Sequence, residues 1–94
     1  MDLGSLSTQL KDKELFKQQC FINGKWEDSD NGETFDVLNP SDLTVVGSMP
    51  NCSKSDTIKA IDAANSSWEA WKKLTGKDRS IIIRKWHELI LENI

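Results

Sequence analysis

The feature that most constrains the fold is a change of apolar periodicity at Pro50. Beyond it, apolar residues recur at steps of three and four: Ile58, Ile61, Ala64, Trp68 and Trp71. This period places them on one face of a helix. Ser53 and Asp56 have the spacing of a capping box in an acidic variant, so we expect a helix over residues 54–72.

A second amphipathic helix is expected over residues 77–94, where Thr75 and Asp78 repeat the capping arrangement. The residues expected to face inward are Ile82, Ile83, Trp86, Leu89 and Ile90. No glycine or proline follows to end this helix, and the apolar pattern continues to the last residue. The pattern therefore predicts a truncated chain.

Before Pro50 the sequence predicts short strands within residues 20–49. Asn23 and Gly24 separate two runs of strand-forming residues, which indicates a hairpin. A two-residue type I′ turn needs positive φ at both central positions, which asparagine tolerates and glycine adopts without steric cost. Turn clusters divide the rest into two further strands, expected at residues 34–38 and 43–47. Residues 1–15 are polar and are expected to form a leader.

Charge and length exclude several classes of protein. Twelve Lys and Arg against fifteen Asp and Glu give a net charge of −3, which does not attract nucleic acid or an anionic membrane surface. The longest aliphatic runs fall far short of the ~20 residues that cross a bilayer, and the first residues lack a secretory apolar run. We therefore expect a cytoplasmic chain, with one thin core at most in 94 residues.

Few residues suggest chemistry. Cys20 and Cys52 form no CxxC pair and lack a histidine cluster, so both are expected to be free thiols. His87 is expected in a packed or surface role, and Trp26 is the tryptophan expected to stay partly exposed. Basic residues near the helix junction alternate with Glu69, Asp78 and Glu88, which favours a solvated face over a binding stripe. The basic residues are Lys72, Lys73, Lys77, Arg79, Arg84 and Lys85.

Several short motifs, taken in order, resemble one family. They are FINGKW, TFDVLNP, VVGSMP, AIDAAN, WEAW and DRSIIIRKW. Together they resemble the start of the aldehyde dehydrogenase superfamily over residues 16–94, and within it the bacterial succinate-semialdehyde dehydrogenases. The resemblance implies an α/β fold, of which this chain supplies an α+β part. Its strands would lie at an edge of the cofactor domain, and its two helices would lie beside the dinucleotide-binding sheet.

The resemblance also implies where the chemistry lies. The intact family uses NAD or NADP. Its nucleophilic cysteine, general-base glutamate, oxyanion asparagine and cofactor turn all lie beyond the last residue of this chain. We therefore assign no catalytic, cofactor-binding or metal residue here, and neither Cys20 nor Cys52 matches the nucleophile motif. Family members can hold a monovalent cation near the carbonyls matching Val37 and Leu38, but the remaining ligands are absent, so no cation site is assigned.

Two hypotheses about function follow. In the first, the chain is a scaffold segment of an enzyme that converts succinic semialdehyde to succinate, and it is inactive alone. In the second, it is a small interaction module that pairs through a strand edge or helix face. The expected partners are another copy of the chain or the remainder of the dehydrogenase.

Overall fold

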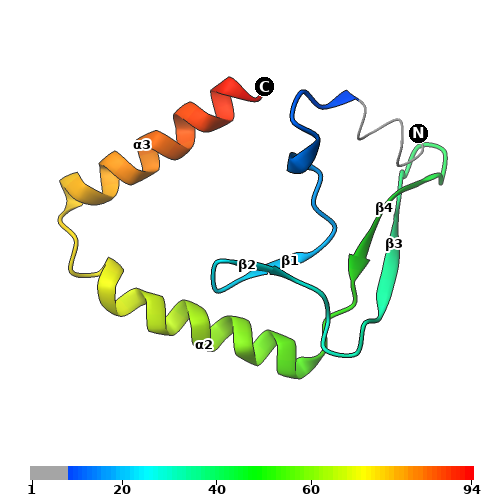
Figure 1. The fold of residues 1–94 in the computed structure, drawn as a ribbon, viewed down its shortest axis with the longest axis horizontal. Helices are drawn as coiled ribbons and strands as arrows, with labels where there is room; N and C mark the ends of the chain where they lie inside the picture. The colour runs from blue at the N-terminus through cyan, green and yellow to red at the C-terminus, as the bar shows by residue number, and fades with distance from the viewer. Residues whose placement is uncertain (1–8) are drawn as a thin grey trace.

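The computed structural model describes residues 9–94 and shows strands followed by two long helices (Figure 1). A short 3₁₀ helix, η1 (Lys13–Leu15), precedes them. The elements that follow are β1 (Cys20–Ile22), β2 (Lys25–Glu27), β3 (Thr34–Leu38), β4 (Val45–Pro50), α2 (Lys54–Trp71) and α3 (Gly76–Glu92). Residues 1–8 of the expected leader lie outside the described residues.

β1 and β2 form the predicted hairpin. They pair antiparallel, with Phe21 opposite Trp26, and the two rings lie 5.0 Å apart between centroids. Asn23 has φ 53° and Gly24 has φ 76°, which confirms the positive φ expected at both central positions of the turn. The local sequence alone therefore determines this hairpin.

β3 and β4 form a second antiparallel hairpin, and here one expectation was wrong. The sequence predicts a strand from residue 43, but Leu43 has φ 61° and donates its N–H to the Asn39 carbonyl at 2.7 Å. Asn39 donates in turn to the Thr44 carbonyl at 2.7 Å. Leu43 thus lies in the turn, and β4 runs from Val45 through Pro50. Apolar character in Leu43 gave no sign of this positive φ, which is uncommon outside glycine and asparagine.

Both helices begin with the predicted capping boxes. The Ser53 hydroxyl accepts from the Asp56 N–H, and the Asp56 carboxylate accepts from the Ser53 N–H at 3.0 Å. Thr75 and Asp78 make the same reciprocal pair at the start of α3, at 3.1 and 3.3 Å. The start of a helix leaves four backbone N–H groups without an intrahelical acceptor, and each capping box satisfies part of this set.

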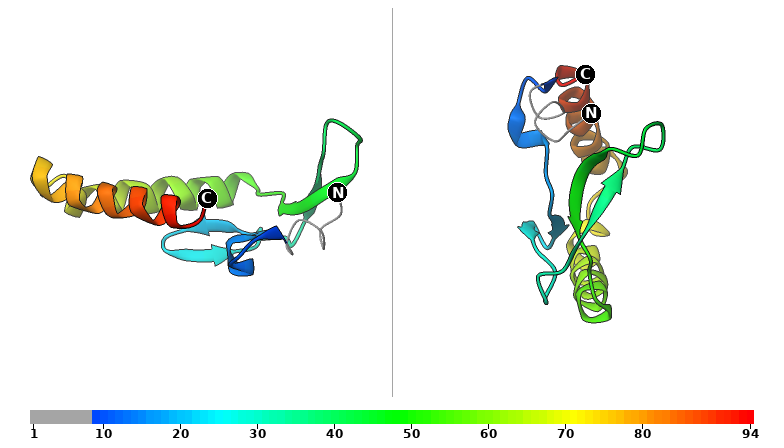
Figure 2. Two further views of the ribbon diagram at one scale, coloured as in Figure 1. Left: turned by 90° about the horizontal axis from the view of Figure 1, so that it is seen from above. Right: turned by 90° about the vertical axis from the view of Figure 1, so that its right-hand side faces the viewer.

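The elements are arranged as an open ring rather than as layers around a core. Figure 1 shows α3 running away from α2, while the β1–β2 hairpin lies along α2 and contacts it through β1. The right-hand view of Figure 2 shows α3 above α2, at the opposite end of the picture. The radius of gyration is 16.8 Å, whereas a compact chain of this length has about 12 Å. The expected inward face of the second helix is therefore uncovered.

No Ala, Val, Ile, Leu, Met, Phe, Trp or Cys side chain is buried within residues 9–94. Ile82 is 50% exposed and Trp86 is 67% exposed, although the periodicity predicts that both face inward. Trp68 on α2 is 49% exposed. Periodicity identifies the residues that share a face, but it does not identify what covers that face. In this chain, the described residues leave most of the apolar faces of the helices uncovered.

Candidate functional site: the start of α2 and the apolar helix faces

The start of α2 is where distant parts of the chain meet. Asp56 is 8% exposed, and its Oδ2 accepts from the N–H of Ser53 at 3.0 Å and of Asp30 at 3.1 Å. Asp30 belongs to the loop between β2 and β3. A single carboxylate therefore caps the helix and holds that loop against it. Hydrogen bonds to a charged acceptor are among the stronger ones in proteins.

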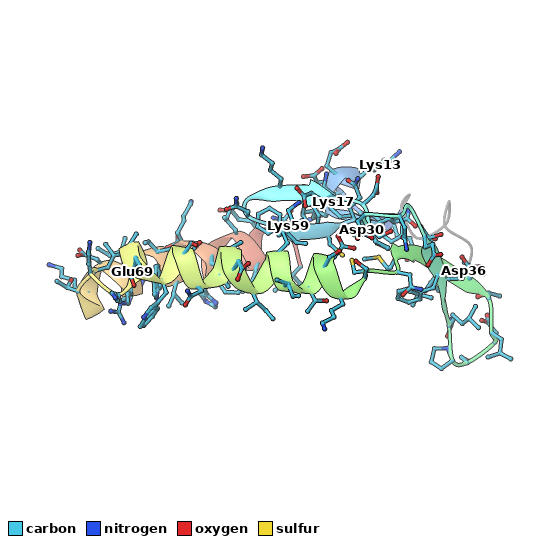
Figure 3. The ribbon with its side chains drawn as sticks, turned by 90° about the horizontal axis from the view of Figure 1, so that it is seen from below. Lys13, Lys17, Asp30, Asp36, Lys59 and Glu69 are labelled. Carbon is cyan, nitrogen blue, oxygen red and sulfur yellow. The ribbon has the colours of Figure 1, made fainter. Side chains whose placement is uncertain are left out.

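The Asp30 carboxylate strengthens the same junction (Figure 3). Its Oδ2 accepts from the hydroxyls of Ser55 at 2.6 Å and Ser53 at 2.8 Å. The hydrogen bond from Ser55 has the larger effect and that from Ser53 the next, and both lower the pKa of Asp30 below its usual value of 3.8. A carboxylate beside the first turn of a helix is also favoured by the helix dipole. We call Asp30, Ser53, Ser55 and Asp56 the α2 junction.

The two cysteines meet beside the α2 junction, which their sequence spacing did not predict. Their Sγ atoms lie 3.4 Å apart across 32 residues, and both are free thiols, as expected. The hydrogen bond to Cys20 is the main reason why the pKa of the Cys52 thiol rises to about 11, with partial desolvation adding to it. A nucleophilic cysteine needs the opposite shift. The pair does not have the electrostatics of a catalytic thiolate.

An ion pair attaches the hairpin to α2 farther along the helix. Lys59 Nζ lies 2.7 Å from Glu27 Oε2, and this contact is the main reason why the pKa of Lys59 is raised (Figure 3). Glu27 is the last residue of β2, so the pair joins the hairpin to the second turn of the helix. Because Lys59 is exposed, the pair orients the hairpin more than it stabilises it.

Other sequence candidates lie on the surface. Trp26 is 45% exposed, as expected, but Trp68 and Trp86 are more exposed, so Trp26 is not the one tryptophan left exposed. His87 is exposed on α3. Lys72 pairs with Glu69 at 2.8 Å, as expected for a solvated face. Within residues 9–94 no three His, Cys, Asp or Glu side chains are grouped as metal ligands. Neither of the long helices in this range has the length and apolarity needed to cross a bilayer.

Both long helices carry exposed apolar side chains. An open groove of about 450 Å³ runs along α2, lined by Ala64, Ser67, Trp68, Ala70, Trp71 and Leu74. On α3 the exposed apolar residues are Ile81, Ile82, Ile83, Trp86, Leu89, Ile90 and Leu91. We call these two sets the apolar helix surface. Exposed apolar areas of this kind mark places where another protein surface packs.

Trp71 is the one tryptophan of the helices that is half-buried. The Arg79 guanidinium lies 6.0 Å from its ring centroid and donates from Nη2 to the Lys72 carbonyl at 3.0 Å. The Arg79 Nε is buried and has no hydrogen-bond partner among the described residues. Arg79 therefore links the start of α3 to the end of α2 across the corner between them.

Comparison with known proteins identifies the family of this chain. Residues 26–94 match the model of the aldehyde dehydrogenase family. The chain is 48% identical to a glutarate-semialdehyde dehydrogenase of Pseudomonas putida over 85 residues, and 46% identical to an NADP(+) succinate-semialdehyde dehydrogenase of Escherichia coli. Each alignment covers 90% of this chain and 18% of the relative.

Solved structures agree with the sequence relatives. An NADP-dependent enzyme of Escherichia coli superposes with a TM-score of 0.84 at 46% identity, over 89% of this chain and 18% of that one. A succinate-semialdehyde dehydrogenase of Burkholderia pseudomallei superposes with the same TM-score at 34% identity, over 89% and 17%. The strands and helices match the N-terminal part of these folds, and the chain spans about a fifth of their length. This chain belongs to the aldehyde dehydrogenase family.

Proposed function

We propose that this chain is the N-terminal scaffold of an NAD(P)-dependent aldehyde dehydrogenase and is catalytically inactive alone. The observation that carries the proposal is the apolar helix surface. The fold of this chain superposes on an intact enzyme of Escherichia coli but aligns with only 18% of it. The apolar side chains of both helices are left exposed. Packing against the remaining part of such an enzyme would remove this apolar surface from water.

We propose the semialdehyde of a short dicarboxylic acid as the substrate of that enzyme. The relatives act, by their names, on glutarate and succinate semialdehydes, and their identities to this chain are 48% and 46%. These two substrates differ by one methylene and share a terminal carboxylate. The similarity supports this class of semialdehydes. The class includes succinic semialdehyde, the substrate that the sequence motifs indicate.

We assign cofactor binding to residues outside this chain. Dinucleotide phosphates are usually held by a glycine-rich turn between a strand and a helix. The five glycines of this chain form no Gly-x-Gly-x-x-Gly turn, and α2 begins after Asn51, Cys52 and Ser53 instead. The residues present do not fit the cofactor, so their proposed role is to support the fold around it. The proposal takes NAD or NADP as the cofactor of the intact enzyme.

A segment exchange tests the proposal. The matching N-terminal segment of the Pseudomonas putida relative is replaced by this chain, and reduction of nicotinamide is followed with glutaric and succinic semialdehyde. We expect an active enzyme. Trp68→Asp and Ile82→Asp should lower the yield of active enzyme, while Ser66→Asp on the polar side of α2 should not. A folded but inactive exchange protein, or equal effects of all three substitutions, would contradict a scaffold role.

A further inference from the structure

The thiols of Cys20 and Cys52 are positioned to react with each other. Their sulfur atoms are 3.4 Å apart, and a disulfide bond needs a separation of about 2.05 Å. A small adjustment of two side chains would bridge this difference. We propose that Cys20 and Cys52 form a site of reversible oxidative modification, at which a peroxide closes a disulfide between β1 and the segment before α2.

The backbone on both sides of the pair is held in place. Just before Cys20, the Gln18 side-chain oxygen accepts from the Ser48 N–H at 2.8 Å. Cys20 itself is paired with Glu27 in the hairpin. After Cys52, Ser53 is fixed by the helix cap and by the Asp30 carboxylate. The contact between the thiols is therefore a consequence of two anchored segments, rather than of two free loops.

Small reagents can reach the pair. Cys52 is exposed and Cys20 is half-buried. An open groove of about 390 Å³ lies beside them, lined by Cys20, Phe21, Ile22, Cys52, Asp56, Thr57 and Ala60. A hydroperoxide group is far smaller than this groove. Access to small reagents and a neighbouring thiol that can resolve a sulfenic acid are two features of oxidisable cysteines.

The reaction balances in two steps. The Cys20 thiolate attacks one peroxide oxygen, so that an S–O bond forms, the O–O bond breaks, and water leaves after protonation. The Cys52 sulfur then attacks the Cys20 sulfenic sulfur, forming the S–S bond and releasing hydroxide, which takes up the Cys52 proton and leaves as water. Two electrons pass from the thiols to the peroxide. Because the hydrogen bond between the two sulfurs raises the pKa of Cys52 to about 11, we take Cys20 as the attacking group and Cys52 as the resolving one. Thiol reductants reverse the modification by exchange.

The test measures the effective concentration of the two thiols with this chain built into the segment-exchange enzyme, whose remaining cysteines are replaced by serine. The protein is equilibrated with reduced and oxidised glutathione in native buffer and in strong urea, and the intramolecular disulfide is quantified by mass and thiol titration. We expect an effective concentration at least about tenfold higher in native buffer. Equal or lower values in native buffer would overturn the proposal.

A matched variant and a direct peroxide reaction complete the test. The double variant Cys52→Ser with Ser66→Cys moves the second thiol along α2, and its native value should not exceed its urea value. Hydrogen peroxide should convert the unaltered chain to a monomer that is lighter by two hydrogen atoms. In Cys52→Ser it should leave a sulfenic acid at Cys20 that dimedone traps. Formation of intermolecular disulfides alone, or a disulfide in the control pair as favourable as in the natural one, would refute the assignment.

Discussion

The backbone N–H of Asp30 donates to Oδ2 of Asp56 over 3.1 Å, although 26 residues separate them. The same oxygen accepts the Ser53 N–H that closes the capping box. A helix cap, which is a local device, thus also holds a loop that comes from another part of the chain. This shared acceptor explains why Asp56 is buried while the other helix cap, Asp78, is exposed.

Removing the Asp56 carboxylate should therefore cost more than removing a cap alone. Asp56→Ala leaves the Ser53 and Asp30 N–H groups without their acceptor, and we expect a loss of about 2–3 kcal/mol in the local opening free energy. Asp78→Ala is the matched control and should cost about 1 kcal/mol. Amide exchange at Asp30 and in the first turns of α2 and α3 measures both. Equal losses in the two variants would show that Asp56 is only a cap.

The α2 junction should loosen in acid. The folded pKa of Asp30 is lowered by its hydrogen bonds to Ser55 and Ser53. A carboxylate with a depressed pKa contributes stability that is present above its ordinary pKa of 3.8 and is lost as the pH falls through the lowered value. NMR titration of the Asp30 carboxyl group should give a midpoint below 3.8. Ser55→Ala should raise this midpoint. A midpoint at or above the ordinary value would contradict the hydrogen-bonded geometry.

The hairpin turn should tolerate no β-branched residue at Gly24. Gly24→Val forces valine to φ 76°, at a cost of about 1–3 kcal/mol. Gly76→Val is a matched control, because neither glycine has an atom within 4 Å of an added Cβ and Gly76 lacks a positive φ. Amide protection at Phe21 and Trp26 should fall only in the first variant. Unchanged protection there would disprove the turn assignment.

The sequence predicted those parts of the fold that local chemistry determines. Asn23 and Gly24 fixed one turn, and Ser53 and Thr75 fixed both helix starts, because each acts on backbone groups a few residues away. The Cys20–Cys52 contact and the Asp30–Asp56 hydrogen bond were not predictable in this way. They join segments far apart in the sequence, and only the assembled junction brings them together. The motif resemblance predicted the family. The periodicity predicted which residues share a helix face, but it did not predict what packs against that face.

The apolar helix surface should make the isolated chain self-associate or fold incompletely. Ile82 and Trp86 are 50% and 67% exposed, and removing such side chains from water is favourable. Sedimentation should show association that increases with concentration. A combined Trp68→Asp and Ile82→Asp variant should associate less, and Ser66→Asp should associate as the unaltered chain does. A compact monomer with a sharp cooperative melt would contradict this prediction.

An activity assay of the purified chain tests the scaffold proposal most directly. The chain is incubated with succinic or glutaric semialdehyde and with NAD or NADP, and the absorbance of the reduced nicotinamide is followed beside Cys20→Ser and Cys52→Ser variants. We predict no turnover above the buffer control in any sample, because a thiolate nucleophile, a base and oxyanion donors must meet in one site for this chemistry. Turnover by the unaltered chain that disappears in one of the two variants would make that cysteine the nucleophile and contradict the scaffold role.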